Sequence, residues 1–292
     1  MRTAILTTVC VGLLIAHSPS SAKDPGALAP SSTWVLDYSE ESCRLARSFG
    51  DGDEKVSLIL AKYAPGTGME IMVSGKTLAP GSSRYITYAF GNAEPTKIEK
   101  PLFGDSGADG TVWQFSGGLI PPDRFEELQN NAAHGSEYAA AEARAAESAE
   151  VFKIGIGRKE TVLDTGMLAK GIEAMDACLD NLVASWGYDP EQLKTIVQGP
   201  EPVGRITSWF NAKDYPDDAL REGLSGAVRF RLGIDIQGRV DKCTIQAAFS
   251  DPSFADKVCS EFMRKGRFVP AKSAAGEPVP SYWVNTVVFL SS

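Results

Sequence analysis

A single stretch near the C-terminal end has the alternation of a half-buried β-strand. From Val228 to Ile236, apolar side chains occupy every second position, with polar residues or glycine between them. Successive side chains of a strand point to opposite faces, so a period of two predicts one face in a hydrophobic core and one in water. We therefore expect a sheet in which Arg229 and Arg231 face water and Ile236 faces the core.

This strand is expected to turn back as a β-hairpin. Gln237-Gly238 supplies the turn, because glycine readily takes the positive φ that tight hairpin turns require. The returning strand places four residues on one face: Cys243, Ile245, Ala247 and Phe249. Val240 is out of phase with that set, which predicts a β-bulge near Asp241.

A helix and a last strand follow the hairpin. Asp251-Pro252 begins the helix, because aspartate caps the first turn and proline has a fixed φ that suits it. Phe254, Val258 and Phe262 recur every fourth position and form its buried stripe. The last strand is predicted at 283–290, and a short helix at 217–222 precedes the whole unit.

The same stretch carries a series of landmarks in fixed order. They are Tyr215-Pro216-x-x-Ala219, Gly226-x-Val228, Asp235-x-x-Gly238-Arg239-Val240, Ser250, Phe268-x-Pro270-Ala271 and Gly276-x-Pro278-Val279. This pattern resembles the C-terminal domain of the TonB family. The resemblance covers roughly a quarter of the chain and implies a TonB-like β-β-α-β domain, which we place at residues 211–292.

The resemblance also implies a partner and a way of binding it. Domains of this family bind outer-membrane receptors by strand pairing, which uses an exposed sheet edge. We expect an envelope protein, an outer-membrane receptor among the candidates, or peptidoglycan as the partner, in the periplasm of a Gram-negative cell. The last strand is the candidate edge, with Tyr282, Val284, Thr286, Val287, Val288 and Leu290 as its residues. In the alternative, this edge is covered by the N-terminal region or by residues 190–214.

Residues 1–22 look like a secretory signal peptide. Arg2 precedes an apolar run from Ala4 to Ala16, and small residues lead to a cleavage point after Ala22. The run is shorter than the roughly 20 residues that a membrane span requires. We expect an exported, periplasmic protein with no stable membrane insertion after cleavage. The alternative is a retained anchor, which would make the chain a TonB-type energy transducer for outer-membrane transport. The family's anchor has a serine four residues before its histidine, whereas Leu13 stands four residues before His17 here.

Residues 23–190 read as a sheet-rich N-terminal α+β domain with no recognised family. Short β-like runs alternate with turn clusters between Thr33 and Phe115, and an alanine-rich helical tract follows Pro121. A long amphipathic helix is predicted at 168–186, where apolar residues step by three and four, with Gly187 at its C-terminal end. Residues 191–210 are expected to be a linker, since prolines interrupt any periodicity. The fold class expected for the whole chain is α+β.

Four cysteines remain after the expected cleavage, an even number that is typical of disulfides in an exported chain. Cys243 lies on the inward face of its strand, and Cys259 lies on the helix that should cover that sheet, so we expect these two to be bonded. By elimination Cys43 should pair with Cys178, next to the buried stripe of the long helix.

Composition excludes several functions. The formal net charge is −8 and no basic patch with interleaved aromatics occurs, so a nucleic-acid partner is not expected. His134 would be the one histidine of the mature chain, which leaves little for histidine-based catalysis. We therefore predict a non-enzymatic binding protein without cofactor or metal. The competing interpretation makes the N-terminal domain an enzyme or inhibitor that docks through the TonB-like module.

Overall fold

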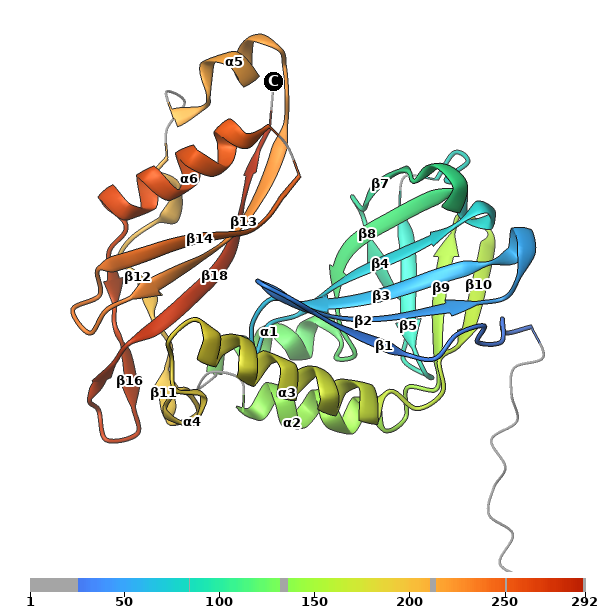
Figure 1. The fold of residues 1–292 in the computed structure, drawn as a ribbon, viewed down its shortest axis with the longest axis horizontal. Coiled ribbons are helices and arrows are strands. Elements are labelled where there is room, and N and C mark those ends of the chain that lie inside the picture. Colours follow the sequence, from blue (N-terminus) through green and yellow to red (C-terminus); the bar gives the residue numbers. More distant parts are fainter. Residues whose placement is uncertain (1–25, 84, 132–135, 211–213, 250, 291–292) are drawn as a thin grey trace, which may run out of the picture.

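The structure is a computed structural model. It describes residues 26–83, 85–131, 136–210, 214–249 and 251–290, and it shows sheets and helices in both halves of the chain (Figure 1). The α+β class expected from the sequence is confirmed. The signal segment 1–22, His17 and His134 lie outside the described residues.

Two antiparallel sheets form most of the N-terminal domain. One has the strand order β1-β2-β3-β4-β8-β7 and the other β10-β9-β5-β6. The strands are β1 (Val35–Ser39), β2 (Ser42–Phe49), β3 (Val56–Lys62), β4 (Met69–Gly75), β5 (Ile86–Phe90), β6 (Thr96–Ile98), β7 (Leu102–Asp105), β8 (Thr111–Gly117), β9 (Val151–Ile156) and β10 (Lys159–Asp164). Their inward residues share one hydrophobic core, in which Leu58, Ile71 and Phe152 have no exposed surface.

Helices cover one side of this domain. They are α1 (Pro122–Asn131), α2 (Ser136–Ala146) and α3 (Ala169–Ser185). The stripe of α3 is buried at Ile172, Met175 and Leu179, because apolar residues three and four apart share a face of a helix. Gly187 follows the helix with a φ of 94°, as a C-terminal glycine cap requires.

The segment expected as a linker is structured. It contains α4 (Pro190–Lys194), β11 (Ile196–Gln198) and β12 (Glu201–Pro202). β11 pairs with β16 (Ala271–Ser273), which also pairs with β17 (Pro278–Val279), and β12 pairs with β15 (Phe268–Val269). These pairings tie the segment to the C-terminal part of the chain.

The C-terminal domain has a three-stranded sheet in the order β14-β13-β18. Its strands are β13 (Gly226–Ile234), β14 (Val240–Phe249) and β18 (Ser281–Phe289), and its helices are α5 (Asp217–Arg221) and α6 (Pro252–Lys265). α6 packs on one face of the sheet through Phe254, Val258 and Phe262, none of which is exposed. Asp251 caps this helix by accepting from the backbone N–H of Ser253.

The hairpin contains the expected bulge but differs from the sequence expectation at Ala247 and Ile236. The register shift at Ile234 leaves Asp241 as an extra residue, which is the expected bulge. A second shift leaves Gln246 unpaired, so Ala247 lies opposite Arg229 and points away from the face of Cys243 and Ile245. Placing Ile236 in the core is also wrong, because the strand ends before it and its side chain is 43% exposed.

The expectation that Arg229 and Arg231 face water is wrong. The sheet face opposite α6 lies against the N-terminal domain (Figure 1), and Arg231 is 1% exposed. Sequence periodicity identified a polar face correctly, but burial of that face depends on a domain more than a hundred residues earlier in the chain.

Candidate functional site

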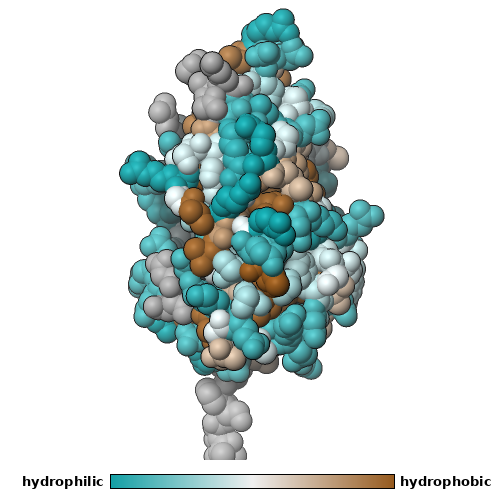
Figure 2. All heavy atoms as spheres, turned by 90° about the vertical axis from the view of Figure 1, so that its left-hand side faces the viewer, coloured by the Kyte–Doolittle hydropathy of each residue, from teal (hydrophilic) through white to brown (hydrophobic). Residues whose placement is uncertain are grey.

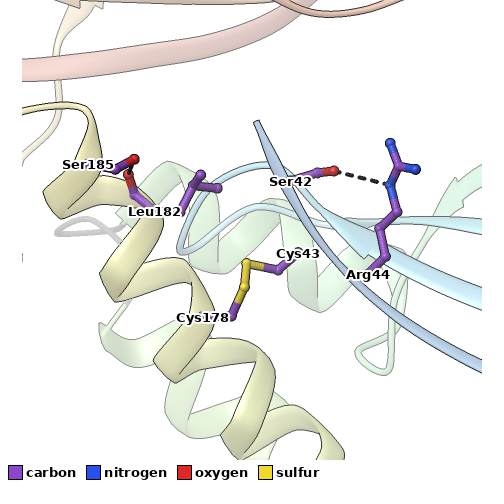
Figure 3. The surroundings of a disulfide bond; sticks show 6 residues. All are labelled: Ser42, Cys43, Arg44, Cys178, Leu182 and Ser185. Carbon is purple, nitrogen blue, oxygen red and sulfur yellow. Dashed lines mark hydrogen bonds between the residues drawn. A yellow bond between two sulfur atoms is a disulfide. The ribbon is translucent and has the colours of Figure 1, made fainter. Parts of the chain in front are cut away.

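Two disulfides hold the framework. Cys43 of β2 is joined to Cys178 of α3, so the bond fixes the helix against the sheet (Figure 3). Cys243 of β14 is joined to Cys259 of α6 within the C-terminal domain. Both bonds therefore stabilise the scaffold, and each lies within a single domain.

The domains meet through an apolar cluster, in which Tyr282 packs on Trp186, and through polar contacts beside it. Arg231 donates through Nη2 to the carboxylate of Glu41, at 3.1 and 3.3 Å from its two oxygens, and its guanidinium lies 3.8 Å from the centre of the Trp186 ring. Nε and Nη1 of Arg231 are buried without a hydrogen-bond partner. Gln246 donates to the backbone carbonyl of Tyr63 at 3.0 Å and so adds a second link between the domains.

A second ion pair lies nearer the end of the sheet. Arg229 binds Glu70 of β4 at 2.5 Å, and its guanidinium stacks on the ring of Tyr63. Glu70 is 8% exposed. This pair therefore joins β13 to β4 across the domain interface.

The last strand is at the edge of its sheet. β18 pairs with β13, and within the described residues no other strand pairs with it. Of the predicted edge residues, Val288 is 60% and Leu290 75% exposed, whereas Tyr282 is buried against Trp186 and Tyr188. The start of the strand is thus covered by the N-terminal domain, and the stretch from Val284 onward is the accessible part.

The direction of the backbone groups on this edge follows from one contact. The N–H of Thr286 donates to the side-chain oxygen of its neighbour Asn285 at 2.7 Å, so it is not used in pairing with β13. Because N–H groups along a strand point alternately to its two sides, those of Val284 and Val288 also point to the open side. The N–H of Val287 then points to β13.

A cleft of about 420 Å³ opens along this edge, between the two domains. We call it the interdomain cleft. Its lining is Thr67, Gly68, Met69, Tyr88, Thr96, Ile98, Ser116, Gly117, Gly118, Ile120, Pro122, Phe125, Arg229, Val284, Asn285 and Thr286. A volume of this size is within the range of ligand-binding pockets. No sequence pattern indicates the cleft, because its walls come from strands and loops that are far apart in the chain.

A group of buried ionisable residues lies under α2 and α3. Lys62 of β3 binds Glu142 of α2 at 2.5 Å, and both are at most 1% exposed; Tyr138 donates to the same carboxylate at 3.0 Å. Burial, and next the neighbouring Glu142, raise the pKa of Tyr138 above its usual value. Burial also raises the pKa of Asp176 to about 6, although Lys62 at 3.9 Å acts in the opposite direction.

This cluster is better explained as a structural ion network than as a reactive site. The charged atoms of Lys62 and Glu142 are enclosed and satisfy each other, as buried charges require. Within the ranges that the structure describes, no group of three or more His, Cys, Asp or Glu is arranged to hold a metal ion. Among these same residues, no helix is long and apolar enough to span a membrane.

Comparison with known proteins assigns the C-terminal part of the chain. No curated protein matches the sequence. Residues 211–290 match a family model described as Gram-negative bacterial TonB protein C-terminal, and the match covers the hairpin, α6 and β18. The C-terminal domain of this chain, at residues 211–290, therefore belongs to the TonB C-terminal family.

Proposed function

We propose that this chain is a non-enzymatic periplasmic protein whose TonB-like domain binds an envelope protein by adding a strand of the partner to the open edge of β18. One observation carries the proposal: β18 is the last strand of its sheet, and on its outer side the described residues place no strand. By strand alternation, the N–H groups of Val284 and Val288 point to that side. An open edge of this kind offers main-chain hydrogen bonds to an extended segment.

The rest of the domain leaves few other approaches. α6 covers one face of the sheet and the N-terminal domain the other. Viewed from the side away from the N-terminal domain, apolar side chains occur in separate areas interrupted by polar ones (Figure 2). A partner that recognised a broad apolar surface would find little of it on this side, which favours recognition through the backbone of β18.

Site-specific photocrosslinking in the periplasm tests the proposal. A photoreactive residue in place of Val288, which is 60% exposed on the open edge, should give a discrete adduct with another protein. The matched control is Met263, which is 44% exposed on α6 and should give none. The same adducts from both positions would contradict binding at the edge.

A proline pair distinguishes backbone pairing from simple proximity. Val288→Pro removes an outward N–H, and edge strands tolerate proline, so the protein should fold and lose the adduct probed from a photoreactive residue at Leu290. Val287→Pro removes an N–H that points to β13 and should instead destabilise the domain, as measured by circular dichroism. A folded Val288→Pro protein that still captures the partner would refute strand addition.

A further inference from the structure

The interdomain cleft reaches the edge of β18 and also borders the sheet face that carries Arg229. Val284, Asn285 and Thr286 are consecutive, and all three line the cleft. Because neighbouring side chains of a strand point to opposite faces, three consecutive lining residues place this part of the cleft beside the strand. A strand added to β18 would occupy a line about 4.8 Å from it, at the mouth of this cleft.

The opposite wall belongs to the N-terminal domain and is mainly apolar. Ile120 and Met69 are buried behind it, and Ile98 and Phe125 are partly exposed beside them. The backbone is close to the surface where the chain passes through Gly68, Gly117 and Gly118. Side chains that entered from an added strand would therefore meet apolar groups and bare backbone.

Charge in the cleft is already balanced. Arg229 is the one ionisable side chain of its lining other than Tyr88, and it is bound to the carboxylate of Glu70. A charged side chain of a ligand would lose water without gaining a free partner. The chemistry of the walls therefore fits uncharged, apolar side chains.

We propose that the interdomain cleft receives the apolar side chains at positions i and i+2 of the captured strand, so that the N-terminal domain selects which partner segments bind. The inference rests on the proposed strand addition. Main-chain pairing at β18 alone tolerates most sequences, whereas a pocket beside the edge adds side-chain specificity. The occupant is an extended segment of a partner protein with an alternating apolar face.

Two synthetic nine-residue peptides test this selection on the full mature chain. One alternates leucine and threonine, the other has threonine at every position, and both carry a terminal lysine at each end for solubility. Threonine is also a good strand former, so the edge should accept both peptides. If leucine side chains enter the cleft, the alternating peptide should bind at least about tenfold more tightly by calorimetry.

Filling the cleft should remove that preference. Ser116 is exposed on β8 and lines the cleft, so Ser116→Trp should bring the alternating peptide down to the affinity of the threonine peptide. The matched control is Ser74→Trp, on the neighbouring strand β4 and on the same face, because Ser74 pairs with Val112 while Ser116 pairs with Glu70. This control should keep the preference, and Ser116→Phe is the substitute if the tryptophan variant does not fold.

The Val288→Pro variant distinguishes strand addition at β18 from selection by the interdomain cleft. If Val288→Pro abolishes binding of both peptides while the wild type binds them equally, strand addition holds and selection by the cleft is wrong. A leucine preference that survives in folded Ser116→Trp protein also overturns the inference. If neither peptide binds, or if Val288→Pro leaves binding unchanged, the proposed strand addition itself fails, and the selection that rests on it fails as well.

Discussion

Substitution of Arg231 and substitution of Glu41, which form an ion pair, should have very different effects on the stability of the protein. The two atoms Nη2 and Oε1 are 3.1 Å apart, and at an effective dielectric constant near 20 their attraction is about 5 kcal/mol before desolvation is counted. Desolvation falls mainly on one side, because the Arg231 side chain is 1% exposed and that of Glu41 is 21% exposed. The cost of each substitution therefore depends on which charge is left behind.

Glu41→Gln leaves a guanidinium buried without a counter-charge, and we expect the free energy of unfolding to fall by about 3 kcal/mol. Arg231→Met leaves a carboxylate that water can still reach. It removes two buried nitrogens without partners, each of which costs about 1–3 kcal/mol, and loses a stacking contact with Trp186 of about 2 kcal/mol. These terms nearly cancel, so the methionine variant should lie within about 1 kcal/mol of the wild type.

Urea unfolding followed by tryptophan fluorescence measures both changes, since Trp186 lies against the guanidinium. The exposed pair between Arg221 and Asp218 is the control, and Asp218→Asn should change the free energy of unfolding by less than about 0.5 kcal/mol. If Arg231→Met destabilises the protein as much as Glu41→Gln does, the argument from unequal desolvation is refuted.

Three further predictions concern the scaffold. Replacing Cys43 and Cys178 together by alanine should lower the free energy of unfolding by about 5 kcal/mol in urea, because their bond closes a loop of sequence separation 135. Gly238→Ala should cost at least about 3 kcal/mol by the same method, since φ is 75° and an added Cβ would lie 1.7 Å from the carbonyl oxygen of Phe268. The raised pKa of Asp176 means that the folded state holds a proton that the unfolded state releases near pH 3.8. The free energy of unfolding should therefore decrease as the pH rises from 4 to about 6.

Each of these has its own counter-result. Peptide mapping that finds free thiols at Cys43 and Cys178 in the wild type would contradict the prediction for the disulfide. A fully stable Gly238→Ala protein would show that the hairpin turn can move away from Phe268. For the third, thermal unfolding of Asp176→Asn across the same pH range should show a shallower decline than the wild type, and an unchanged profile would assign the titration to another group.

Local sequence patterns predicted the parts of the C-terminal domain that depend on near neighbours. The buried stripe of Phe254, Val258 and Phe262 repeats with the helical period, and the cap at Asp251 lies directly before it. The bulge at Asp241 was visible as a break in alternation. In each case the cause and the structure lie within about ten residues of each other, which is why pattern alone was sufficient.

Other features depend on residues that only the fold brings together. The strand pattern of β2 is weak because Arg44 and Arg47 lie among its apolar residues, and in the fold the guanidinium of Arg47 lies over the Trp34 ring. Lys62 and Glu142 are 80 residues apart, so no pattern in either segment predicts a buried ion pair between them. The interdomain cleft belongs to the same class, because its walls are set by contacts between two domains.

The burial of Arg231 also bears on how the TonB-like domain can be used. A sheet with α6 on one face and an open second face could bind a partner over that face, but here the second face is occupied by the N-terminal domain through Glu41, Glu70 and Tyr63. What remains accessible on β18 is the backbone of its open side from Val284 onward, with the cleft beside it. The N-terminal domain thus restricts the approach to the edge and supplies a wall along it, and under the proposed strand addition both domains would contact the added strand.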